Sequence, residues 1–213
     1  MKRIFYILLT ICIFNINVSA NNKNVNWLSH AKSSLPRLSF GVEWSYIGTS
    51  HYTTRYNYFD SEGYRKNKTE KVTGYWSNAE ALLHIGYNLS SNWNISLYSG
   101  IMGIADIHNA VPFSLRATYY FGKDPVKDRW FTYADIGTGI CLKHEPQEIL
   151  TGKIGGGYRF SLSRDAKLDI IAAMRLCYTH PQIYDGDEII ILEWTNRNTA
   201  LVKSISVGIG LTF

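Results

Sequence analysis

A strict alternation of apolar and small residues fills the end of the chain. The apolar positions are Ile205, Val207, Ile209, Leu211 and Phe213, and serine, glycine or threonine stands between them. Because successive side chains of a strand point to opposite faces, this pattern predicts a strand with one apolar face. An ordinary edge strand avoids being long and apolar, since it would template aggregation. We therefore predict a strand that closes a barrel.

The same period of two predicts seven earlier strands. They cover residues 38–46, 79–87, 93–101, 113–121, 132–140, 150–160 and 168–178. Some connections are short, such as 90–92, whereas 51–72 and 179–199 are long. An even number of strands, with short turns at one end and longer loops at the other, is typical of a bacterial outer-membrane barrel. The predicted fold is all-β, an eight-stranded antiparallel up-and-down transmembrane β-barrel.

The faces opposite to the apolar ones carry ionisable side chains among many glycines. Side chains just fill the interior of an eight-stranded barrel, and a charge buried there needs a partner. We predict an internal ion-pair network in a closed lumen rather than a general pore. Its predicted members are Glu43, Glu80, His84, Arg116, Asp135, Lys153, Arg159, Asp169 and Arg175. In a soluble lipocalin-like barrel, by contrast, the apolar residues would line the inside.

Large aromatic residues fall near both ends of the predicted strands. If the first strand rises from the periplasm, one group lies near the lower rim and the other near the upper rim. Such girdles on both sides of an apolar band suit the two interfaces of a bilayer. The predicted lower girdle is Tyr87, Trp93, Phe121, Trp130, Phe160 and Phe213, and the upper girdle is Trp44, Tyr46, Trp76 and Tyr178.

The start of the chain has the features of a cleaved signal peptide. Lys2 and Arg3 precede an apolar run over 4–14, and small residues at 18–20 fit a cleavage site. The run is too short to cross a bilayer as a helix. We predict a signal peptide over 1–20, a polar periplasmic lead-in over 21–36 and the barrel over 37–213.

Composition excludes several classes of function. The net charge is +5, and removal of Lys2 and Arg3 leaves about +3. Without a run rich in Lys and Arg, we expect no nucleic-acid partner. Cys141 and Cys177 remain in the mature chain, too few for a secreted domain stapled by disulfides. No Cys or His cluster has the spacing of a metal site, so we expect no metal and no other cofactor.

The signal sequence, the terminal strand and the paired interior charges resemble those of the OmpA/OmpX-like small outer-membrane barrels. The segment 152–160, Gly-Lys-Ile-Gly-Gly-Gly-Tyr-Arg-Phe, is similar to the outer-membrane β-barrel domain proteins of Bacteroidota. The resemblance covers about residues 37–213. It implies insertion by the barrel assembly machinery, which recognises a terminal strand ending in an aromatic, here Phe213. It implies no particular activity. We expect a monomer in contact with outer-membrane lipid and lipopolysaccharide.

Some eight-stranded barrels of this kind are enzymes that modify lipid A. The deacylase group uses a His, a Ser and an acidic residue on the outer wall. Here His108 lies beside Asp106, with Ser99 and Ser114 nearby in sequence. The His-x-Ser spacing of that group is missing, because Ala110 stands two residues after His108. We expect His108 to be a polar loop residue.

The acyltransferase group presents polar catalytic residues at the outer rim. His51, His144 and His180 are candidates by position only. Scattered rim histidines are usually solvated, so no catalytic residue is assigned.

The predicted loops are the most plausible functional surface. The loop 181–198 is acidic but lacks the spacing of an EF-hand. In the loop 51–72, cations alternate with tyrosines and could bind phosphates of lipopolysaccharide or surface sugars. The cations are Arg55, Arg65, Lys66, Lys68 and Lys71, and the tyrosines are Tyr52, Tyr56, Tyr58 and Tyr64.

Three functions stay open from the sequence alone. The first is a non-enzymatic outer-membrane barrel with a structural or surface-binding role through its loops. The second is a lipid A-modifying enzyme, a deacylase or an acyltransferase. Mass spectrometry of lipid A from cells with and without the gene would distinguish it from the first. The third is a secreted soluble barrel that carries a small ligand, which cell fractionation would identify.

Overall fold

The computed structural model describes residues 36–60, 62–105, 107–122, 124–142, 148–163, 165–181, 183–185, 188–190 and 194–213. These residues belong to one unit, Ser34–Phe213. The predicted signal peptide, and all but the last residue of the lead-in, lie outside the described residues. Among those that are described, no helix has the length and apolar character needed to cross a membrane.

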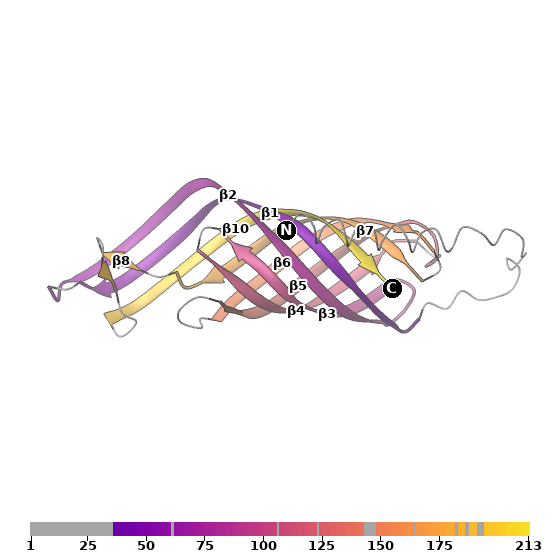
Figure 1. The fold of residues 1–213 in the computed structure, drawn as a ribbon, viewed down its shortest axis with the longest axis horizontal. Coiled ribbons are helices and arrows are strands. Elements are labelled where there is room, and N and C mark those ends of the chain that lie inside the picture. The colour runs from indigo at the N-terminus through magenta and orange to yellow at the C-terminus, as the bar shows by residue number, and fades with distance from the viewer. Residues whose placement is uncertain are drawn as a thin grey trace, which may run out of the picture. The chain divides into compact units, whose positions relative to one another are not determined.

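Eight long strands close into a ring (Figure 1). Around the ring the order is β1-β10-β7-β6-β5-β4-β3-β2, and all neighbouring strands are antiparallel. This arrangement confirms the predicted eight-stranded up-and-down barrel. The strands are β1 (Leu38–Phe59), β2 (Arg65–Asn88), β3 (Trp93–Ile104), β4 (His108–Tyr120), β5 (Arg129–Cys141), β6 (Glu148–Ser161), β7 (Lys167–Thr179) and β10 (Thr195–Thr212).

The two ends of the barrel chain meet at the seam between β1 and β10. Val42 pairs with Leu211. The N–H of Phe213 donates to the carbonyl oxygen of Phe40 at 2.8 Å, and the N–H of Phe40 donates back at 3.0 Å. The predicted terminal strand therefore closes the ring, and its apolar face needs no protection as a free edge.

The prediction of a long loop over 51–72 is wrong. β1 and β2 stay paired from Leu38 and Tyr87 to Phe59 and Arg65, so only residues 60–64 form the turn. β10 likewise begins at Thr195, well before the predicted start at Ile205. Most residues of these segments are polar, so the segments lack the apolar alternation that marked the other strands, although their Thr and Tyr residues favour strands.

These longer strands project past the rest of the barrel at one end (Figure 1). We call residues 51–59 of β1, 65–73 of β2 and 195–203 of β10 the extension. Beside it, β8 (Tyr184–Asp185) and β9 (Glu188–Ile189) form a separate two-stranded sheet. Ile190 and Ile183 are buried and pack with Tyr58 of the extension.

The carboxylate of Asp60 organises the tip of the extension. Its Oδ1 accepts the N–H groups of Glu62 at 3.1 Å and Tyr64 at 2.8 Å, and its Oδ2 lies 3.3 Å from Lys66 Nζ. Gly63 supplies the positive φ of 82° that the turn requires. Desolvation raises the pKa of Asp60, but these hydrogen bonds and the ammonium outweigh it, so the pKa lies below its ordinary value.

Replacing Asp60 with alanine is expected to speed amide hydrogen exchange at Glu62 and Tyr64, because both N–H groups lose their acceptor. Since the pKa is lowered in the folded chain, the stabilisation is present at neutral pH and is lost as the pH falls through that lowered value, below about 4. Exchange measured by NMR should differ between wild type and variant at pH 7 and converge in strong acid. Equal protection at pH 7 would contradict this role.

Candidate functional site

Arg116 lies at the centre of the first ion cluster inside the barrel. Its Nη1 is 2.6 Å from Glu43 Oε2, its Nη2 is 3.2 Å from Glu43 Oε1, and its Nε is 3.2 Å from Asp135 Oδ2. The guanidinium also lies over two aromatic rings, 3.9 Å from the centroid of Tyr98 and 4.1 Å from that of Tyr133. One cation from β4 thus joins β1, β3 and β5 across the lumen.

Two further clusters involve the remaining predicted charges. Lys153 Nζ is 2.6 Å from Glu80 Oε1, and Arg175 Nη1 is 3.8 Å from Glu80 Oε2. Arg159 forms a bidentate pair with Asp169, at 2.7 and 2.6 Å. All of these side chains are buried. The structure therefore brings eight of the nine predicted lumen residues into ion pairs.

His84, the ninth, lies among them without an ion pair to any described residue. Its ring stacks on Tyr98, with 4.8 Å between the centroids. It lines a cavity of about 20 Å³ together with Glu43, Arg159 and Asp169. A cavity of this size holds about one water molecule, so the described side chains leave little open space in this part of the lumen.

Arg129 is a buried cation that the sequence analysis missed. It begins β5, lies over the Tyr120 ring at 4.1 Å, and donates to the carbonyl oxygen of Ser91 at 2.6 Å. The strand predicted over 132–140 began after it, so it was not counted among the inward charges. The spacing of two could have identified it, because Arg129 lies an even number of residues before Asp135 and so shares the inward face of β5 with it.

An apolar layer lies at the end of the lumen nearest the extension. Its buried members are Met102, Ile104, Ala105, Ala110, Cys141, Ile149, Cys177 and Val202, and Tyr52, Trp76 and Ile107 pack against them. Trp76 therefore differs from its predicted place in the upper girdle. β2 continues without interruption past residue 79, so Trp76 shares the inward face with Glu80, and its neighbour Tyr75 is the exposed aromatic.

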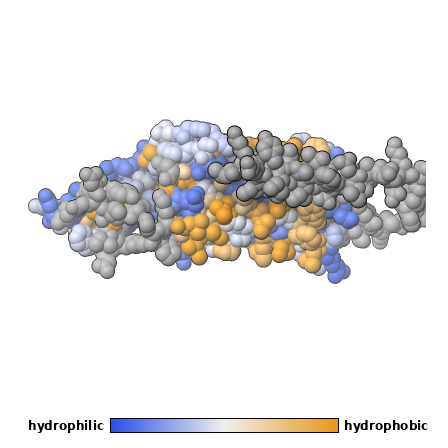
Figure 2. Space-filling model, in the orientation of Figure 1, coloured by the Kyte–Doolittle hydropathy of each residue, from blue (hydrophilic) through white to orange (hydrophobic). Residues whose placement is uncertain are grey.

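The outer surface of the barrel is apolar on every strand. Leu97, Ile154 and Met174 are 65%, 72% and 73% exposed. Figure 2 shows hydrophobic residues over the barrel and mainly hydrophilic ones towards the extension. Soluble monomers rarely expose apolar patches larger than a few hundred Å². Apolar side chains thus point outward and charges inward, the reverse of a lipocalin-like barrel.

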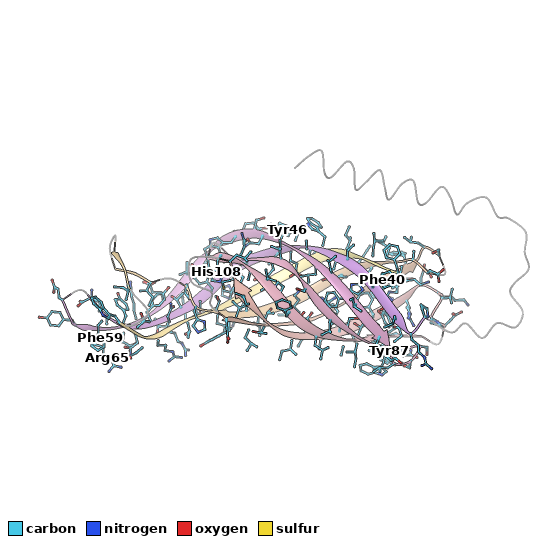
Figure 3. All side chains as sticks on the ribbon, turned by 60° about the horizontal axis from the view of Figure 1, so that its bottom comes forward. Phe40, Tyr46, Phe59, Arg65, Tyr87 and His108 are labelled. Carbon is cyan, nitrogen blue, oxygen red and sulfur yellow. The ribbon has the colours of Figure 1, made fainter. Side chains whose placement is uncertain are left out.

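The other predicted girdle residues are at least partly exposed on the outer wall. Trp93, Tyr119 and Phe121 form one chain of ring contacts, and Trp130, Tyr158 and Phe160 form another. In Figure 3, Phe40 and Tyr87 lie at the end of the barrel away from the extension, whereas Tyr46 lies nearer to it. The hydroxyl group of Tyr46 hydrogen-bonds that of Tyr75.

The residues considered for a deacylase site have other contacts where the structure describes them, and His108 begins β4 instead of lying in a loop as expected. The Nε2 atom of His108 lies 2.9 Å from both Thr179 Oγ1 and Cys141 Sγ, at the apolar layer. Ser99 pairs with Phe113, whose side chain is exposed on the outer face. Ser114 donates instead to Asp135 inside the barrel, at 3.3 Å. Asp106 lies outside the described residues.

The two described rim histidines hydrogen-bond neighbouring polar groups. His51 Nδ1 is 2.9 Å from Ser50 Oγ, and His180 Nδ1 is 3.3 Å from the carbonyl oxygen of Glu148. His144 lies outside the described residues. Across the part of the chain that the structure describes, no group of three or more His, Cys, Asp or Glu side chains could hold a metal ion.

The cations and tyrosines predicted to alternate in one loop lie on two faces of the extension. Tyr56 pairs with Lys68, and Tyr58 pairs with Lys66, which places these residues on the inward face. Arg55, Arg65 and Lys71 occupy outward positions of the same two strands. Figure 3 shows Phe59 and Arg65 together at the tip.

Comparisons with known proteins show a likeness of fold. No protein-family model matches the sequence, and no curated protein matches it significantly. The chain is similar to the crystal structure of Neisserial surface protein A (12% identity, 81% of this chain and 95% of that chain, TM-score 0.47). It is also similar to the outer membrane protein OprG from Pseudomonas aeruginosa (11%, 85% and 98%, 0.48) and to the N-terminal β-barrel domain of OprF from the same organism (17%, 81% and 97%, 0.39).

These neighbours are small outer-membrane β-barrel proteins, the class that the sequence resembles. Identities and TM-scores in this range describe a likeness of fold and say nothing of a shared role. The similarity to proteins of Bacteroidota stays a prediction.

Proposed function

We propose that this chain is a non-enzymatic outer-membrane β-barrel with a closed, charged lumen, and that its role at the cell surface is performed by the extension. The observation that carries this proposal is the orientation of the two faces. A closed ring leaves no strand edge with unpaired N–H and C=O groups, which lipid could not hydrogen-bond. Exposed apolar side chains on all eight strands would make a soluble form aggregate.

The dimensions of the apolar surface support insertion in a bilayer. On β10, outward residues are apolar from Phe213 back to Ile205, and Lys203 follows on the same face. Eight residue steps at about 3.3 Å span roughly 26 Å along a strand. With the tilt of about 40° usual for such barrels, this gives a band of roughly 20 Å, close to the apolar height of known outer-membrane barrels.

The contents of the lumen support a closed barrel rather than a general porin. The ion clusters occupy the middle of the ring, and the apolar layer covers the end nearest the extension. Conduction would require several buried pairs to separate at once, and each separation leaves an uncompensated charge. We place the short turns in the periplasm and the extension outside the cell, as in other barrels with unequal loops.

Reconstitution of the mature chain tests this proposal. The protein should insert into phospholipid vesicles, migrate differently on gels before and after heating, and fractionate with the outer membrane in cells. In planar bilayers it should give no stepwise conductance. Recovery in the soluble fraction would contradict the membrane assignment, and steady open channels would contradict the closed lumen.

A further inference from the structure

The outward face of the extension carries several cations and, among the residues that the structure describes, no acidic side chain. Strand pairing determines which residues share this face: Arg55 pairs with Thr69 and Thr199, and Lys71 pairs with Thr53. Threonine and asparagine occupy most of the positions between the cations. We call the cations, all of them exposed, the basic strip: Arg55, Arg65, Lys71, Arg197 and Lys203.

The cations on the inward side of the same strands lie beside acidic residues. Lys68 forms an ion pair with Glu70 beside it on that face, and Lys66 lies 3.3 Å from Asp60. Within the described residues, no ion pair involves a member of the basic strip, although Arg65 donates to the side chain of Asn57 at 3.1 Å. The extension thus neutralises its inward cations and leaves the outward ones available.

The basic strip is continuous with the apolar surface of the barrel. Lys203 lies two residues from Ile205, which is 64% exposed on the same face of β10. Successive outward rows are about 7 Å apart along a strand. The strip therefore begins where the apolar band ends and runs away from it, past Arg55, towards the tip. If the band lies in the membrane, the strip lies at and above the lipid head groups.

We propose that the basic strip binds phosphate groups of the lipopolysaccharide that surrounds the barrel, from the head group outward along its sugar chain. This inference rests on the proposed membrane function, which sets the height of the strip. Arginine and lysine side chains form their strongest hydrogen bonds with phosphate and carboxylate oxygens. Threonine and asparagine between them can hydrogen-bond sugar hydroxyls. A free polyanion shares this chemistry, but continuity with the lipid-facing surface favours a ligand anchored in the bilayer.

The test measures lipopolysaccharide around the protein folded in phosphatidylcholine vesicles. Energy transfer from the tryptophans to a fluorescent lipopolysaccharide would report its binding. The variant Arg55→Gln, Lys71→Gln, Arg197→Gln should bind about a hundredfold more weakly, because each cation near an anionic surface contributes about fivefold. Dephosphorylated lipopolysaccharide should bind wild type at least as weakly as phosphorylated lipopolysaccharide binds the variant, because the variant keeps Arg65 and Lys203. Added salt should weaken only the phosphate-dependent part of binding.

The matched control removes three cations elsewhere, with Lys66→Gln, Lys68→Gln and Lys127→Gln, and should stay within about twofold of wild type. Equal binding by the two triple variants would overturn the inference, as would undiminished binding of dephosphorylated lipopolysaccharide. If soluble polyphosphate bound wild type more tightly than lipopolysaccharide does, the ligand would be a free polyanion and not one anchored in the bilayer. A wild-type chain that does not insert or show the heat-dependent gel shift would instead refute the proposed function.

Discussion

Replacing Arg116 with alanine is expected to lower the free energy of unfolding by about 3–5 kcal/mol. The substitution leaves Glu43 and Asp135 as buried carboxylates that have lost their shared cation, and it removes the guanidinium from between Tyr98 and Tyr133. A buried charge without a partner costs far more than the loss of a surface ion pair. Urea titration of the barrel in phospholipid vesicles, followed by tryptophan fluorescence, would measure the change.

Two other variants separate this effect from a general loss of charge. Lys127→Ala removes a cation that is 80% exposed and pairs with Asp124 in a turn, so it should change stability by about 0.5 kcal/mol or less. The combination Arg116→Met, Glu43→Gln, Asp135→Asn removes cation and anions together and should recover part of the loss. An Arg116→Ala variant no less stable than Lys127→Ala would show that the lumen is hydrated rather than packed.

Replacing Leu97 with arginine is expected to destabilise the barrel in a bilayer by about 2–4 kcal/mol. Leu97 is 65% exposed in the middle of β3, between Ile85 of β2 and Leu115 of β4. At the centre of the membrane an outward arginine meets hydrocarbon, whereas on a water-facing surface it would cost about 0.5 kcal/mol or less. The same urea titration measures the difference.

Leu89→Arg provides the control at a similar exposure. Leu89 is 58% exposed but lies in the turn between β2 and β3, at the edge of the apolar band. The cost of arginine falls to about 0–1 kcal/mol near the interface. Equal and small effects at residues 89 and 97 would indicate that the whole outer wall is in water.

Much of the barrel could be predicted because its two sides face opposite environments at every step. The pattern from Ile205 to Phe213 separates outward apolar side chains from inward ones with a period of two, and the closing strand lies there. Charges such as Arg116 and Asp135 fell on the other face for the same reason. A strand bounded by two such different media leaves a strong signal in the sequence.

The remaining features depend on register and local irregularity. The partner of Glu43 lies on β4, on another side of the lumen, which no spacing along the chain reveals. In the extension most residues on both faces are polar, so alternation gave no strand signal. A bulge between Thr49 and His51 then reverses which positions of β1 point inward. Without it Arg55 would point inward and the basic strip would lose its central cation.

Photo-crosslinking from the position of Leu97 tests most directly whether the apolar face contacts lipid. A benzophenone amino acid at residue 97, in protein inserted in native outer membranes, should attach to lipid acyl chains on illumination. The same group at Val126, in the turn before β5, should not. Lipid adducts at residue 97 and none at residue 126 are the predicted result, whereas no lipid adduct at residue 97 would contradict the account.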